Sequence, residues 1–247
     1  MSKKFELDKF DVSEIVQSLI TRASNFDSDR ASRANLIDPF AAALESALNG
    51  YSTEQQWIDS EHQRTRQKNL MNHIGNLQQS IIGKLDGWTS FPSGSNMPDV
   101  VGVRGNQKFL FEVKNKHNTM NSSSAAETYD NLENFLNRPE FSGFVGGVVA
   151  VISPVRKPYF KQFAPSGRTN RDDIVWLPGR VFYAIATDPL SRVPFISVNP
   201  RDDLHLWDSW KAIDLMVEEF WREIELQTGY KTPEWIKDLT NQALGSA

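Results

Sequence analysis

The chain has 247 residues, of which 39% are hydrophobic and 11% aromatic, and its formal net charge is −4. It has enough apolar mass for a sizeable core, either as one large domain or as a core with a smaller appendage. The absence of cysteine excludes disulfides and thiolate metal sites and favours a reducing cytoplasm. No apolar run reaches transmembrane length, and Met1–Phe5 do not begin a signal peptide, so we expect neither membrane insertion nor export.

The spacing of apolar residues predicts helices throughout the first third of the chain. These helices are expected over residues 11–24, 34–48 and 53–82. Asp38-Pro39 lies near the first turn of the second helix, and Thr53 is the expected cap of the third. Gly75 is a candidate break within the third helix.

The rest of the chain alternates between strand and helix patterns. A Ser/Gly loop at 93–96 precedes a predicted β-hairpin, with strands at 100–103 and 109–113 and a turn at 104–107. The later elements are a helix at 122–136 capped by Ser122, Ser123 or Ser124, a buried strand at 144–153, a basic loop at 154–171 with or without a short helix, strands at 174–177 and 180–187, and helices at 203–227 and 232–243.

This order predicts an α/β fold in which a central mixed β-sheet is flanked by helices. We expect one domain over residues 1–247. It would comprise a helical part at 1–85, a sheet core at 86–200 and C-terminal helices at 201–247.

Pro98-Asp99, Glu112 and Lys114 form the most informative pattern in the chain. Side chains alternate across a strand, so Glu112 and Lys114 leave the hairpin on the same face. Asp99 lies at the start of the partner strand, level with the end where these two side chains emerge. Three charged groups are therefore predicted to converge on one edge of the sheet.

This cluster suits one kind of chemistry. Two carboxylates and a backbone carbonyl, here that of Val113, are ligands for a hard cation, above all Mg²⁺. Such a metal polarises a phosphoryl oxygen and activates a bound water. Lys114 would either help to deprotonate that water or stabilise charge on the phosphate. Although so short a pattern also occurs by chance on a solvated strand, the hairpin context favours a catalytic site for phosphodiester hydrolysis.

A polar, basic run follows Lys114 and has no apolar periodicity. It reads Asn115-Lys116-His117-Asn118-Thr119, and such side chains commonly contact phosphates and base edges. Together with Asp99, Glu112 and Lys114, this run resembles the active-site segment of type II restriction endonucleases of the PD-(D/E)xK superfamily. It looks most like the group that cuts within GGNCC, in which the lysine is likewise followed by an Asn-Lys-x-Asn-Thr run.

The resemblance implies a restriction-endonuclease-like core, Mg²⁺ as cofactor, and cleavage of both strands of double-stranded DNA at a near-palindromic, GGNCC-like site. Such a target is read most simply by a two-fold symmetric protein, so we expect a homodimer. The prokaryotic cell would also need a cognate DNA methyltransferase to protect its own DNA. Two alternatives stay open: a repair or junction-resolving nuclease of the same superfamily, and a DNA-binding module without catalysis.

The resemblance also directs attention upstream of Asp99. In the superfamily, a helix before this aspartate often supplies a further polar residue to the metal or its waters. Gln78 is the candidate here, with Asn76 or Gln79 as alternates and Glu61 as the acidic alternative. All four are equally explained as polar positions on an amphipathic helix.

Charge is distributed unevenly along the chain. Residues 156–180 are locally basic and the chain after residue 202 is acidic, which is compatible with a basic cleft in a mildly acidic body. Guanine is usually read by Arg or Lys. The candidates for base reading are Lys116 and Asn118 after Lys114, and Arg168, Asn170 and Arg171 in the basic loop. Arg201 is a further candidate, while the adjacent Asp202 and Asp203 either accept from cytosine amines or form a helix-capping turn. The predicted DNA-contacting set is Asn115, Lys116, His117, Asn118, Thr119, Arg168, Asn170, Arg171 and Arg201.

Overall fold

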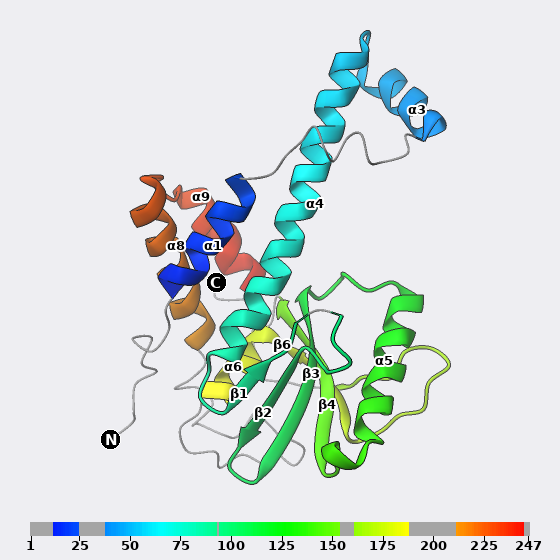
Figure 1. The fold of residues 1–247 in the computed structure, drawn as a ribbon, viewed down its shortest axis with the longest axis vertical. Coiled ribbons are helices and arrows are strands. Elements are labelled where there is room, and N and C mark those ends of the chain that lie inside the picture. The colour runs from blue at the N-terminus through cyan, green and yellow to red at the C-terminus, as the bar shows by residue number, and fades with distance from the viewer. Residues whose placement is uncertain (1–11, 25–37, 93, 154–160, 188–210, 245–247) are drawn as a thin grey trace. The chain divides into compact units, whose positions relative to one another are not determined.

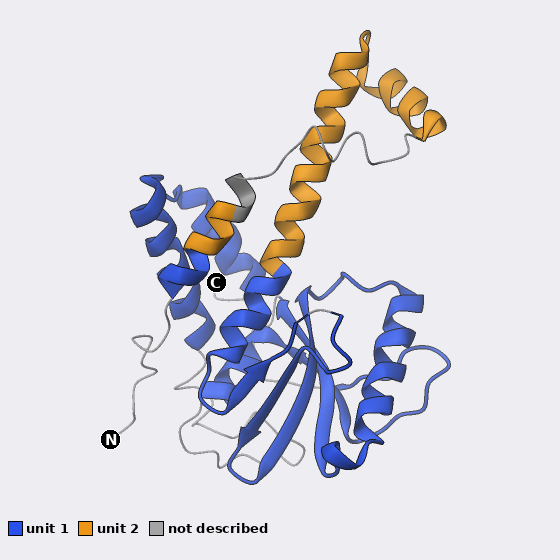
Figure 2. Ribbon diagram, viewed as in Figure 1, with its two compact units in different colours: residues 1–16, 75–247 blue, residues 17–74 orange. Residues whose placement is uncertain are grey.

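The computed structural model describes residues 12–24, 38–92, 94–153, 161–187 and 211–244. The chain divides into two compact units, residues 1–16 with 75–247 and residues 17–74 (Figure 2). None of the described helices is long and apolar enough to cross a lipid bilayer.

A six-stranded mixed sheet forms the centre of the larger unit (Figure 1). Its strands run in the order β1-β2-β3-β4-β6-β5, and β3, β4 and β6 are parallel while the other neighbours are antiparallel. Their bounds are β1 Trp88–Ser90, β2 Val100–Arg104, β3 Gln107–Lys116, β4 Phe144–Ile152, β5 Lys161–Gln162 and β6 Ile174–Pro178. The predicted α/β class and the predicted hairpin, now β2 and β3, are confirmed, whereas β1 and β5 were not predicted.

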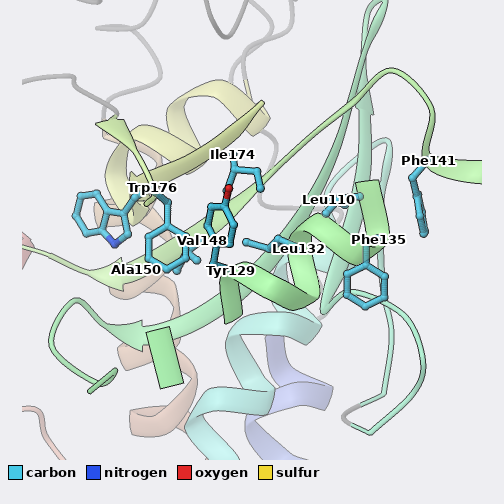
Figure 3. Close-up of a cluster of buried hydrophobic side chains, with 10 residues drawn as sticks. Leu110, Tyr129, Leu132, Phe135, Phe141, Val148, Ala150, Ile174 and Trp176 are labelled. Carbon is cyan, nitrogen blue, oxygen red and sulfur yellow. The ribbon is translucent and has the colours of Figure 1, made fainter. Parts of the chain in front are cut away.

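Each face of the sheet is covered by a helix. On one face, α5 (Ser122–Leu136) packs against β3, β4 and β6. The buried cluster between them comprises Leu110, Tyr129, Leu132, Phe135, Phe141, Val148, Ala150, Phe163, Ile174 and Trp176 (Figure 3). On the other face, Trp88 stacks on Phe111, and Phe182 packs edge-on against both rings. Because side chains alternate along β3, Glu112 and Lys114 leave the sheet on the side of Leu110 and α5.

The helices follow the predicted pattern with shifted ends. They are α1 Val12–Ser24, α3 Pro39–Asn49, α4 Glu54–Gly83, α8 Ala212–Thr228 and α9 Glu234–Leu244, with a short 3₁₀ turn, η2, at Pro139–Phe141. Asp38 is the N-cap of α3, since its carboxylate accepts the N–H groups of Phe40 and Ala41. The predicted parts of these helices at 11, 34–37 and 203–210 lie outside the described residues, as does the first part of the basic loop, 154–160.

Two local predictions are wrong. α5 is capped by Asn121, whose side chain accepts the N–H of Ser124, in place of one of the three serines. α4 is one continuous helix of 30 residues, so Gly75 does not break it.

The predicted strand at 180–187 is also wrong, because Gly179–Thr187 forms the helix α6. Nearly every residue of this segment is buried, and a short, mostly apolar run can be read either as a buried strand or as a buried helix. Arg180 is buried within it, donating two hydrogen bonds of 2.6 Å to Asp214 of α8 and one of 3.0 Å to the carbonyl of Leu244. Arg180 lies in the basic segment 156–180, but its hydrogen bonds link α6 to α8 and α9.

Replacing Gly75 with alanine is expected to stabilise the protein by about 0.5–1 kcal/mol, since glycine disfavours a helix interior by this amount. Apart from its chain neighbours and the backbone of its own helix, no described atom would lie within 4 Å of an added Cβ. Urea unfolding of Gly75→Ala against wild type measures the difference. A loss of stability would show that the helix needs glycine at this position.

Candidate active site

The β2–β3 register brings the predicted catalytic groups together. Val100 pairs with Phe111, so the antiparallel register places Asp99 beside Glu112. Oδ2 of Asp99 accepts the N–H of Val113 at 2.8 Å, and Nζ of Lys114 lies 3.4 Å from Oε2 of Glu112. All three charged side chains are partly buried, with the Glu112 side chain 17% and the Lys114 side chain 27% exposed. The convergence predicted from the alternation of side chains is what the structure shows.

Two carboxylates share this site with one ammonium group. Burial raises the pKa of Asp99, against the hydrogen bond from Val113 and the charge of Lys114. Burial likewise raises the pKa of Glu112, and the neighbouring negative charge of Asp99 adds to the effect. A second positive charge between the carboxylates would relieve both costs. The donor set therefore fits a cation.

The backbone of Val113 presents a third oxygen to the same place. In a β-strand the N–H and C=O of one residue point to the same edge. The N–H of Val113 is bonded to Asp99, beyond the last paired residue of β2, so its carbonyl points to that side as well. No group of three or more His, Asp or Glu side chains that suits a metal occurs in the described part of the chain. Two carboxylates, one carbonyl and several waters make a set that suits Mg²⁺, which usually keeps part of its hydration shell.

The polar run after Lys114 lies at the same end of the sheet. Asn115 is half-buried, and Lys116, His117, Asn118 and Thr119 are exposed. The N–H of His117 donates to the carbonyl of Ile152 at 3.1 Å, and the Thr119 hydroxyl donates to the carbonyl of Lys116 at 2.9 Å. These bonds fix the backbone of the run beside the carboxylates and leave the side chains of Lys116 and Asn118 in solvent.

Comparison with known proteins identifies the family to which this site belongs. The family model described as Eco47II restriction endonuclease matches residues 6–193, which include the whole hairpin and the polar run. The chain belongs to the Eco47II restriction endonuclease family.

Two relatives agree with this assignment. The type II restriction enzyme Eco47II of Escherichia coli is 29% identical over 183 residues, which cover 70% of this chain and 74% of that enzyme. The type II restriction enzyme Sau96I of Staphylococcus aureus is 33% identical over 98 residues, covering 40% of this chain and 36% of that enzyme. The activity class of the chain is therefore that of a site-specific type II restriction endonuclease, a nuclease that acts on DNA. This decides against the two alternatives that the sequence alone left open.

In this Eco47II-family chain, the basic loop is fastened to α5. Arg168 forms two hydrogen bonds of 2.6 Å with Asp130, and Arg171 contacts both Asp173 and Glu133. The hydroxyl of Tyr129 donates to the carbonyl of Thr169 at 2.6 Å. Sequence reasoning missed these pairs, although acids three residues apart on an exposed helix face were a signal for them.

The position of this loop also differs from that of the carboxylates. It leads into the amino end of β6, whereas Glu112 and Lys114 lie in the carboxyl half of the parallel strand β3. The described part of the loop after β5, residues 163–171, thus lies toward the opposite end of the parallel strands. Asn170 is exposed between the two fastened arginines, and Arg201 lies outside the described residues.

The upstream candidates differ in burial and in their contacts. Gln78 is buried on α4, and its Oε1 accepts a hydrogen bond from the Tyr183 hydroxyl at 3.4 Å. Asn76 is exposed, and Gln79 is half-buried. Glu61 belongs to the other compact unit, where it pairs with Arg64. The contact with Tyr183 of α6 gives Gln78 a packing role in the free protein.

Proposed function

We propose that this endonuclease is Mg²⁺-dependent and cuts both strands of a near-palindromic, GGNCC-like site as a homodimer. The observation that carries the proposal is the pair of adjacent, partly buried carboxylates of Asp99 and Glu112 with a single ammonium group beside them. Such a pair costs stability in the free protein, and a cation-dependent activity accounts for its presence.

Asp99 and Glu112 would hold the metal, with the carbonyl of Val113 as a third ligand. Bound there, Mg²⁺ supplies polarisation of a phosphoryl oxygen and a lowered pKa for a coordinated water. Asp99 is held for this task by the N–H of Val113. Lys114, held near Glu112, would position and activate the attacking water. Gln78 is proposed as an accessory residue that would have to leave Tyr183 to reach this site.

The exposed side chains of residues 115–119 would contact the DNA that passes the carboxylates. The GGNCC-like target rests on the resemblance of the run from Glu112 to Asn121 to enzymes with that specificity. Arg168, Asn170, Arg171 and Arg201 remain proposed DNA contacts. For Arg168 and Arg171, binding would require exchange of a carboxylate for a phosphate.

A two-fold symmetric dimer would place one active site on each strand of a near-palindromic target. We keep one domain over residues 1–247 as part of the proposal. The division into two compact units does not show that either unit folds on its own. The enzyme would act in a prokaryotic cytoplasm alongside a methyltransferase that protects the same site.

Plasmid digestion tests the proposed function. With Mg²⁺ the protein is expected to give discrete fragments, and EDTA is expected to abolish cleavage reversibly. Sedimentation should give twice the 28.1 kDa mass of one chain. Cleavage that persists in EDTA would contradict the metal dependence, and a smear would contradict the site specificity.

Glu112→Gln is expected to raise the melting temperature of the metal-free protein at neutral pH and to abolish its stabilisation by Mg²⁺. The substitution leaves one carboxylate facing one ammonium group, whereas the wild type holds two carboxylates. Folding raises the pKa of both Asp99 and Glu112, so their contribution to stability is present at low pH and is lost as the pH rises through the folded values. Differential scanning fluorimetry in EDTA and in Mg²⁺, from acid to neutral pH, measures both effects.

Glu219→Gln is the matched control, because the pKa of Glu219 is lowered by Arg222. This variant should lose stability slightly or not at all and keep the response to Mg²⁺. If Mg²⁺ shifts the melting temperature of Glu112→Gln as much as that of wild type, the result would argue against a metal at Glu112.

A further inference from the structure

One segment of α4 combines a basic charge balance with an exposed polar surface. We call residues 63–72 of this helix the amide–basic segment. It lies within a stretch that contains no acidic residue, since no Asp or Glu occurs between Glu61 and Asp86. In a chain with a net charge of −4, such a stretch is a local departure from the average.

The exposed face of this segment has an ordered arrangement. Its exposed residues include Gln63, Arg66, Gln67, Lys68, Leu70 and Met71. Successive helical residues are about 100° apart around the axis, so the two glutamines, Leu70 and Met71 lie along the middle of the face. Arg66 and Lys68 project from its two opposite sides. An amide and apolar centre is thus flanked by one positive charge on each side.

The two flanking charges have no acidic partner among the residues that the structure describes. Arg64, the nearest base, is used by Glu45 and Glu61. Within the described ranges, neither Arg66 nor Lys68 forms an ion pair. Arg168 and Arg171, in contrast, are held by carboxylates. Arg66 and Lys68 are therefore available to an anion without breaking an ion pair among the described residues.

Leu70 and Met71 are 41% and 36% exposed, and apolar side chains at these positions fit double-stranded DNA as the anionic partner. An α-helix with its side chains is about 10–12 Å across, and the major groove of DNA is about 12 Å wide. Apolar side chains in the groove contact thymine methyl groups and base edges, and amides donate to and accept from base edges. Ten helical residues span about 15 Å, which corresponds to roughly four base pairs.

We infer that the amide–basic segment of α4 is a DNA-recognition element of this enzyme. Arg66 and Lys68 bind phosphates on the two sides of a groove, and Gln63 and Gln67 face the base edges. The inference rests on the proposed function, and it adds a DNA contact separate from that of the residues after Lys114.

Binding of two duplexes by full-length protein tests the inference. The Lys114→Ala background with Mg²⁺ keeps the DNA intact, and the probes are one duplex with a GGNCC site and one with that site scrambled. Arg66→Ala/Lys68→Ala is expected to weaken binding to both duplexes about tenfold. It should also reduce the slope of log affinity against log salt by about two, because each phosphate contact contributes about 0.9. Gln63→Ala/Gln67→Ala is expected to weaken binding only to the site-bearing duplex, by about tenfold.

The controls separate the inference from the proposed function. Alanine favours a helix, so these substitutions retain α4. Arg222→Ala removes a guanidinium on α8 that is already paired with Glu219, and it should leave the salt slope unchanged. An unchanged slope and affinity in Arg66→Ala/Lys68→Ala would make the segment an ordinary solvated face and overturn the inference, while wild-type cleavage would still support the proposed function. If wild type neither binds nor cuts the site-bearing duplex, the proposed function fails and the inference fails with it.

Discussion

Lys114→Ala is expected to lower the rate of DNA cleavage about 10³-fold, within the range for loss of a group that transfers a proton or stabilises charge in the transition state. Its ammonium group lies 3.4 Å from Glu112 and is the positive group that the structure brings to the two carboxylates. The substitution removes that charge without altering the carbonyl of Val113 or the hydrogen bond that holds Asp99. Single-turnover cleavage of a site-bearing duplex, with saturating protein and Mg²⁺, isolates the chemical step from binding.

Lys108→Ala is the matched control for this prediction. Lys108 lies on the same strand at an even spacing from Lys114, and its ammonium group sits 5.6 Å from the centre of the Phe144 ring. It is at the other end of β3, so its loss should leave the single-turnover rate unchanged. Equal rates for Lys114→Ala and Lys108→Ala would remove Lys114 from the chemistry.

Gly179→Ala is expected to destabilise the protein by up to about 3 kcal/mol, the usual upper range for inserting an extra methyl group into a well-packed interior. Gly179 begins α6 directly after β6, and an added Cβ would lie 2.2 Å from the carbonyl oxygen and 2.6 Å from the Cα of Val151. Backbone atoms of β4 cannot yield as a flexible side chain would. A loss of about 3 kcal/mol in a chain of this size corresponds to roughly 10 °C in melting temperature, which calorimetry or urea unfolding detects.

Gly75→Ala provides the comparison, because it makes the same chemical change in a helix with no atom near the new Cβ. The two variants should move the urea midpoint in opposite directions. A Gly179→Ala protein as stable as wild type would mean that α6 does not approach β4 as closely as the structure has it.

The hairpin was predictable because its determinants are local. Alternation fixes which side chains share a face, and the turn at Gly105-Asn106 joins strands that pair residue by residue from Arg104 and Gln107 back to Val100 and Phe111. The meeting of Asp99, Glu112 and Lys114 follows from that register alone. The mixed sheet could likewise be anticipated from the near-continuous apolar run of β4, a pattern typical of strands covered on both faces.

The misassigned parts depend on contacts that are remote in the sequence. α6 reads like a strand because it is short and mostly apolar, and its contacts with β4 and α8 come from residues distant in the sequence. β1 has three residues, too few to show a period. The basic loop seemed free to meet DNA because the acids that hold Arg168 and Arg171 on α5 lie 38 residues away. Charge counted along a segment does not show which bases are already paired.

Sequencing the fragment ends after digestion of a plasmid with wild-type protein and Mg²⁺ tests the central claim most directly. The expected result is that every end falls within copies of one short, near-palindromic, GGNCC-like sequence, and that Asp99→Ala and Lys114→Ala yield no fragments while remaining folded. Fragment ends without a common sequence, or undiminished cleavage by either variant, would contradict the assignment of Asp99, Glu112 and Lys114 as the catalytic centre of a site-specific endonuclease.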